Sequence, residues 1–136
     1  MFTRISLLLL FSFVIAEWVW SDAAVTPSRL APVSLIHVLS VEEQLIKEAT
    51  AQGLPPHIAL NVAWEESRFQ EHIVSKTHDY GVMQLNQYYY PTAPGMTTEE
   101  NIREGVSLLA KYWKLSHSET LTARAYRFGP RVLRNI

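Results

Sequence analysis

The sequence has no cysteine among its 136 residues. Disulfide frameworks and cysteine-ligated metal sites are therefore excluded. An excess of one charge sign is also lacking, because 12 Lys and Arg residues stand against 13 Asp and Glu residues, a formal net charge of -1. A near-neutral chain has no electrostatic footprint for nucleic acid, so we expect no nucleic-acid partner. A chain of 136 residues supports one domain with one core.

Long apolar runs are confined to the N-terminus, where residues 5–16 are apolar apart from two serines. This run is shorter than the roughly 20 residues of a membrane span. It follows Arg4 and precedes the small residues Ala23 and Ala24, which is the pattern of a secretory signal. We therefore expect a periplasmic or secreted protein with no stable membrane span after signal cleavage. The expected divisions are a signal peptide at 1–24, a linker at 25–40 and the folded domain at 41–136.

Capping residues and apolar spacing predict four helices in the folded domain. The expected starts are Ser40, whose Glu43 completes a capping box, then Pro56, Thr97 or Thr98, and Ser118. Glycines at 53 and 129 are expected to end the first and last helices, and the second is expected to end near Gln70. Residues 71–86 contain helix-breaking types and predict a turn or short hairpin followed by one helical turn. The fold class is therefore mainly α, with at most a small β-hairpin.

Glu66 is the residue with the most distinctive setting. It follows Val62 by four positions and Ala63 by three, so it projects from or beside the buried stripe of the second helix. Burial disfavours the charged form, so we expect the pKa of Glu66 to rise. A protonated acid facing groups that grip a sugar is one way to build a glycan-cleaving site. Taken alone, Glu66 would be interpreted as a solvated helix acid, because most helix carboxylates are exposed. We expect that role for Glu65, about 100° around the helix.

Four blocks, in order along the chain, carry a family resemblance. They are Glu66-Ser67-Arg68-Phe69, then Ser75, then Gly81-Val82-Met83-Gln84-Leu85, and finally Ala125-Tyr126-Arg127-Phe128-Gly129. In these blocks the chain, from about Val41 onward, resembles the lytic transglycosylases of the soluble-lytic-transglycosylase type, within the lysozyme-like superfamily. Two positions depart from that pattern: Val82 replaces the usual Leu, and Arg127 replaces the usual Asn.

The resemblance implies a lysozyme-like single domain at 41–136, with any small β-hairpin beside the active site. It implies that Glu66 is the acid, and later the base, that cleaves peptidoglycan between N-acetylmuramic acid and N-acetylglucosamine. The sugar's own 6-hydroxyl would attack, giving a 1,6-anhydro product without a protein nucleophile. The implied substrate-binding residues are Ser67, Ser75, Gln84 and Tyr126. Reasoning from residue type alone leaves structural roles open for all four, as capping or turn hydroxyls, a turn-stabilising amide and a core aromatic.

Asp79 keeps a second mechanism open. The Asp79-Tyr80-Gly81 run also resembles animal-type lysozymes, in which the matching Asp assists hydrolysis of the same bond, although those enzymes rely on disulfides that this chain lacks. Asp79 could also be an Asx-turn residue that bonds its own backbone. A third alternative is a degenerate, non-catalytic glycan-binding envelope factor. Arg127 and the few residues after Gly129 favour this alternative, whereas an intact Glu66 counts against it.

No metal or cofactor is expected. The five histidines show no metal-ligand spacing, and the sequence has no glycine-rich phosphate loop. Peptidoglycan glycan strands are the expected partner. The resemblance adds an envelope-spanning secretion, conjugation or pilus apparatus as a partner class.

Overall fold

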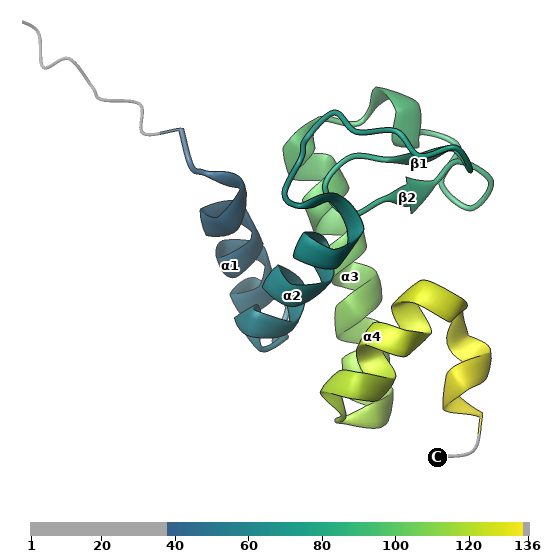
Figure 1. Cartoon of the computed structure of the whole chain (residues 1–136). Coiled ribbons are helices and arrows are strands. Elements are labelled where there is room, and N and C mark those ends of the chain that lie inside the picture. The colour runs from purple at the N-terminus through teal and green to yellow at the C-terminus, as the bar shows by residue number, and fades with distance from the viewer. Residues whose placement is uncertain (1–37, 135–136) are drawn as a thin grey trace, which may run out of the picture. The chain divides into compact units, whose positions relative to one another are not determined.

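The computed structural model describes residues 38–134, so the predicted signal peptide at 1–24 and most of the predicted linker lie outside the described residues. Four α-helices and one two-stranded sheet make up the described part (Figure 1). The elements, in chain order, are α1 Val41–Ala51, α2 Pro56–Ser67, β1 Asp79–Tyr80, β2 Leu85–Asn86, the 3-10 helix η1 Ala93–Gly95, α3 Thr98–Ser116, α4 Glu119–Phe128 and the 3-10 helix η2 Pro130–Leu133. The prediction of a mainly α, lysozyme-like domain with a small hairpin is confirmed.

Local capping sets where the helices begin, as the sequence predicted. Ser40 accepts a hydrogen bond from the Glu43 amide at 3.2 Å, and the Glu43 carboxylate accepts one from the Ser40 amide at 2.8 Å. Thr97 and Glu100 form the same reciprocal box at the start of α3. The Ser118 hydroxyl caps α4 by accepting from the Leu121 amide at 3.4 Å. These contacts satisfy backbone donors that a helix start leaves unpaired.

Helix α2 ends at Ser67, three residues before the predicted end near Gln70. Arg68 and Phe69 have positive φ values of 56° and 62°, which break the helical hydrogen-bond ladder and turn the chain back. The Phe69 ring lies 5.4 Å from the Trp64 ring, and the Arg68 guanidinium lies 4.7 Å from the centre of the same indole. This early end places Glu66 in the last turn of α2, facing the loop that follows.

Strands β1 and β2 pair antiparallel, with Asp79 opposite Asn86 and Tyr80 opposite Leu85. The turn at residues 81–84 connects the two strands, whereas the sequence prediction had one helical turn after the hairpin. Gln84 has a φ of 47° and its amide donates to the Gly81 carbonyl at 3.2 Å, which closes this turn inside the hairpin. The predicted order was wrong because the strands are only two residues each and carry little periodic signal.

Helix α3 packs against both α1 and α4 and lies between them in Figure 1. Its buried face includes Ile102, Val106 and Leu109, whereas Trp113 is only partly buried. Met83, fully buried in the hairpin turn, reaches the backbone of α3 at Gly105. A Cβ at Gly105 would lie 2.5 Å from the Met83 Cβ, so only glycine allows this approach. None of the helices among residues 38–134 is long and apolar enough to cross a membrane.

Candidate active site

A groove with a volume of about 740 Å³ lies where the end of α2, the hairpin, the middle of α3 and the end of α4 meet. Binding sites for small molecules commonly have volumes of about 300–1,000 Å³. Its lining residues are Glu66, Asp79, Gln84, Leu85, Asn86, Tyr89, Tyr90, Leu108, Tyr112, Tyr126, Arg127, Phe128, Gly129 and Pro130. Two carboxylates therefore face a groove rich in aromatic side chains, which suits a sugar chain.

Glu66 enters this groove from the last turn of α2, and its side chain is 20% exposed. Burial raises the pKa of Glu66, and the nearby carboxylates of Asp79 and Glu65 act in the same direction. The guanidinium of Arg127 opposes that rise. The net direction is upward, so the predicted rise is found and Glu66 is suited to hold a proton. Glu65 is 61% exposed in its side chain, in line with the expectation that it is solvated.

Arg127, at the end of α4, lies between the two neighbouring carboxylates of α2. Its Nε is 3.6 Å from Glu66 Oε1, and its Nη2 is 3.4 Å from Glu65 Oε2. The side chain lines the groove and is 47% exposed, so it faces both the candidate site and solvent. The contact with Glu66 joins residues 61 positions apart, so no local sequence pattern predicts it.

Asp79, on β1, is held by side chains from both sides of the hairpin. Ser75 and Thr77 hydroxyls donate to its Oδ2, each at 2.5 Å, and the Asn86 amide donates to Oδ1 at 2.7 Å. Partial burial acts to raise the pKa of Asp79, but these three hydrogen bonds outweigh it and the pKa is lowered. Ser75, not Asp79, bonds the local backbone, because its hydroxyl accepts from the amides of Thr77 and Asp79. The Asx-turn alternative for Asp79 is therefore wrong.

The lowered pKa of Asp79 predicts an acid-sensitive contribution to stability. Because the folded-state pKa lies below the unfolded value, this stability is present above about pH 4 and is lost as pH falls through the folded pKa. We expect Asp79→Asn to lower the free energy of unfolding by about 1–3 kcal/mol at pH 7. The difference from the unsubstituted chain should shrink near pH 3, as measured by urea unfolding at both pH values. The same carboxyl-to-amide change at exposed Glu99, in the first turn of α3, should cost at most about 0.3–1 kcal/mol. An equal loss at both pH values in Asp79→Asn would contradict the assignment.

Gln84 and Tyr126 both line the groove, and both also bind the hairpin turn. The Gln84 side-chain Nε2 donates to the carbonyls of Gly81 at 2.9 Å and Ile73 at 3.3 Å. The Tyr126 hydroxyl donates to the Met83 carbonyl at 2.6 Å, which ties α4 to the turn. Burial, followed by the charge of Glu66, places the pKa of Tyr126 well above its usual value, so this phenol stays neutral. Within residues 38–134, the Gln84 side-chain oxygen accepts no hydrogen bond and is the atom left for a ligand.

Ser67 and Ser75, the other two residues predicted to bind substrate, do not line the groove. Ser67 is 2% exposed and its hydroxyl donates to the Ala63 carbonyl one turn back, at 3.2 Å. Ser75 donates a hydrogen bond to the Asp79 carboxylate, as described above. Among the tyrosines that follow the hairpin, Tyr89 and Tyr90 line the groove, whereas Tyr88 is 82% exposed and does not.

Asn101, which the sequence interpretation missed, supports the site from α3. Its Oδ1 accepts from the Met83 amide and its Nδ2 donates to the Tyr80 carbonyl, both at 2.8 Å. Gly81, with a φ of 73°, packs against this amide so closely that a Cβ would lie 2.8 Å from Asn101 Cγ. A signal was present, because Asn101, Gly105, Leu108 and Tyr112 recur at helical spacing and face the hairpin or the groove. A buried asparagine at the start of such a stripe needs hydrogen-bond partners, which here are backbone groups of the hairpin.

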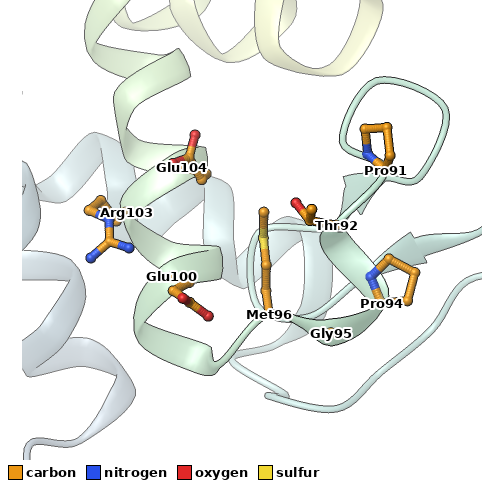
Figure 2. A pocket seen from close by; sticks show the side chains of 8 residues that line it. All are labelled: Pro91, Thr92, Pro94, Gly95, Met96, Glu100, Arg103 and Glu104. Atoms are coloured by element: carbon orange, nitrogen blue, oxygen red, sulfur yellow. The ribbon is translucent and has the colours of Figure 1, made fainter.

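A second hollow, of about 550 Å³, lies between η1 and the first half of α3. Figure 2 shows Met96 between the loop residues Thr92 and Pro94 and the α3 carboxylates Glu100 and Glu104. Glu100 is already used by the capping box of α3, which lowers its pKa. Glu100 is therefore not a proton-holding acid of the kind that the groove has in Glu66. Within residues 38–134, no group of three or more His, Cys, Asp or Glu side chains is placed to hold a metal ion.

Comparison with known families identifies the segment that carries this site. Residues 43–136 match the family model described as "Transglycosylase SLT domain". The match spans well over half of the chain and contains Glu66, the hairpin and Arg127. No curated protein matches the chain.

Proposed function

The chain belongs to the transglycosylase SLT domain family, and from this premise we propose that it cleaves peptidoglycan with Glu66 as its single catalytic acid and base. The family supports a peptidoglycan-acting transglycosylase function in general. The observation that carries the specific proposal is the setting of Glu66, a mostly buried carboxyl with a raised pKa in a groove lined by aromatic side chains. An acid of this kind can be protonated when substrate arrives.

In the proposed reaction, Glu66 donates its proton to the glycosidic oxygen between N-acetylmuramic acid and N-acetylglucosamine. The bond between the anomeric carbon of the muramoyl sugar and this oxygen breaks, so the oxygen leaves with the N-acetylglucosamine as a hydroxyl. The 6-hydroxyl oxygen of the same muramoyl sugar forms the new bond to the anomeric carbon. Glu66, now a carboxylate, takes the proton of that hydroxyl, which restores the acid and leaves a 1,6-anhydro ring. No water is consumed, so one carboxyl completes the cycle.

The contacts of Asp79 favour a supporting role for this second carboxylate. Three hydrogen bonds fix both of its oxygens in the hairpin, which is what a positioning residue needs. One observation favours the hydrolytic alternative: Asp79 also lines the groove, and its charge acts on Glu66. Two carboxyl groups with pKa values pushed apart would suit a lysozyme-type division of labour.

Product analysis separates these mechanisms. We expect the purified chain, incubated with isolated peptidoglycan, to release muropeptides with 1,6-anhydro ends, identified by mass spectrometry because they are lighter by one water than reducing-end products. Reducing ends, together with comparable losses of activity in Asp79→Asn and Glu66→Gln, would replace the proposal with hydrolysis. The absence of any release would instead leave a glycan-binding factor.

We propose a periplasmic or secreted location, because residues 1–24 carry the signal pattern and the substrate lies outside the cytoplasm. N-terminal sequencing of the chain recovered from the cell envelope should begin near residue 24 or 25; an N-terminus at Met1 would overturn this. An envelope-spanning secretion, conjugation or pilus apparatus is the partner class proposed with it. Crosslinking in intact cells should capture an envelope component, and capture of none would remove that part.

A further inference from the structure

Arg127 is the only cation among the groove-lining residues that the structure describes, and it is loosely held there. Its distances of 3.6 Å to Glu66 and 3.4 Å to Glu65 exceed the roughly 2.7–2.9 Å of a well-formed charge-assisted hydrogen bond. The side chain is 47% exposed. A guanidinium with two long contacts and open solvent access can exchange them for an acceptor that fits better.

A carboxylate is the acceptor that fits a guanidinium best, because the planar fork can donate two parallel hydrogen bonds to it. The groove without Arg127 would repel such a group, since its other charged lining residues are Glu66 and Asp79, with Glu65 close by. Phe128, 67% exposed, and Gly129 follow Arg127 in the chain and also line the groove.

We propose that Arg127 is a carboxylate-recognition site, which releases Glu66 and binds a carboxylate that the glycan strand carries near the cleaved bond. This rests on the proposed function. Peptidoglycan offers that chemistry from two sources, the lactyl carboxylate of muramoyl sugars without peptide and the carboxylates of stem peptides. Recognition would select strands that carry an anionic group over neutral sugar polymers.

The release of Glu66 by Arg127 would also favour the protonated form of Glu66. The groups that act on Glu66 are Arg127 from α4, Asp79 from β1 and Glu65 from α2, and of these only Arg127 lowers the pKa of Glu66. When the guanidinium turns to the substrate, that opposing effect weakens and the pKa of Glu66 rises further. Substrate carboxylate recognition and protonation of the catalytic acid are therefore coupled through one side chain.

The test compares initial rates on soluble peptidoglycan strands with free carboxylates and on the same strands after carbodiimide amidation. We expect amidation to lower kcat/KM of the unsubstituted enzyme by about tenfold, the scale of one charge-assisted contact. Arg127→Gln should cleave both substrates at similar rates, Arg127→Lys should keep part of the preference, and the matched control Arg103→Gln, on exposed α3 surface, should behave as the unsubstituted enzyme. An equal effect of amidation on the unsubstituted enzyme and on Arg127→Gln would overturn the proposal.

The same measurement on peptide-free strands separates the two carboxylate sources. Sensitivity to amidation of peptide-free strands assigns the lactyl carboxylate, and sensitivity only of peptide-bearing strands assigns the stem peptide. Failure of the proposed function gives a different result, because the unsubstituted enzyme would then cleave no strand or would release products with reducing ends in place of 1,6-anhydro ends. Cleavage with no effect of amidation would remove the recognition site and leave the function standing.

The pH profile provides a readout that a purely structural role would not change. The profile of kcat/KM reports the free enzyme and that of kcat reports the complex. With carboxylate-bearing strands, the high-pH limb of kcat should lie at higher pH than that of kcat/KM, because Arg127 has left Glu66. The two limbs should coincide in Arg127→Gln. Coinciding limbs in the unsubstituted enzyme would contradict the exchange.

Discussion

Glu66→Gln is expected to lower kcat on peptidoglycan by about 10²–10⁴-fold, the range of a positioned general acid and base. Glutamine keeps the shape of the side chain but cannot donate the proton that the leaving sugar requires or take up the proton of the attacking hydroxyl. KM should change little, since the aromatic lining of the groove is untouched. Release of muropeptides, followed by chromatography and mass spectrometry, measures the loss.

The stability of Glu66→Gln distinguishes a lost catalytic group from a damaged fold. Because burial raises the folded-state pKa of Glu66, the stability linked to its protonated form is lost as pH rises through that pKa. Glutamine removes this penalty, and the half-exposed contact with Arg127 contributes little. The melting temperature at pH 7 should therefore be equal or higher. Glu99→Gln, an exposed carboxyl-to-amide change on α3, should keep full activity, and an active Glu66→Gln enzyme would refute the role of Glu66.

Asn101→Ala is expected to destabilise the domain by about 2–6 kcal/mol, although the Asn101 side chain forms no hydrogen bond with a groove-lining residue. The substitution leaves the Met83 amide and the Tyr80 carbonyl without their partner in a buried turn, at about 1–3 kcal/mol each. A loss of this size lowers the melting temperature of a domain of about 100 residues by at least about 10 °C. Thermal unfolding followed by circular dichroism measures it.

Activity should fall with the Asn101→Ala change, even at temperatures where the chain is folded. The turn that Asn101 holds carries Gln84, and its Met83 carbonyl accepts the Tyr126 hydroxyl that ties α4 to the site. The matched control is Asn61→Ala on the exposed face of α2, which should stay within about 0.5 kcal/mol of the unsubstituted chain. If both variants melted together, the turn would not depend on Asn101.

The helix starts were predictable because capping is local. The hydroxyls of Ser40, Thr97 and Ser118 bond amides three residues away, so both partners stand in the same short stretch of sequence. The end of α2 was less predictable, because nothing in the sequence requires Arg68 and Phe69 to adopt positive φ values. Packing of Phe69 against Trp64 accompanies that conformation. The short hairpin was predicted, but the order of its strands and the turn was not, since two-residue strands carry no periodicity.

The candidate site likewise contains features that the sequence predicted and features that it did not. Glu66 was singled out by its place beside an apolar helical stripe and by the motif blocks, which also pointed to Gln84 and Tyr126. Asp79 was singled out by the lysozyme-like run Asp79-Tyr80-Gly81, and the fold brings all four residues to one groove. The same reasoning assigned substrate contacts to Ser67 and Ser75. Ser67 instead bonds its own helix, and Ser75 supports Asp79, because hydroxyls find near backbone and side-chain partners first.

By itself, the sequence determined the helical frame and its caps and placed Glu66 beside an apolar helical stripe, because each depends on neighbours within about one helical turn. Only the tertiary structure decided what surrounds that acid. It brought Arg127 across from α4 to oppose the effect of burial on Glu66, and it placed the amide of Asn101 under the hairpin turn. Both contacts join elements that are distant in the chain, so their geometry exists only once α2, α3 and α4 have packed around the groove.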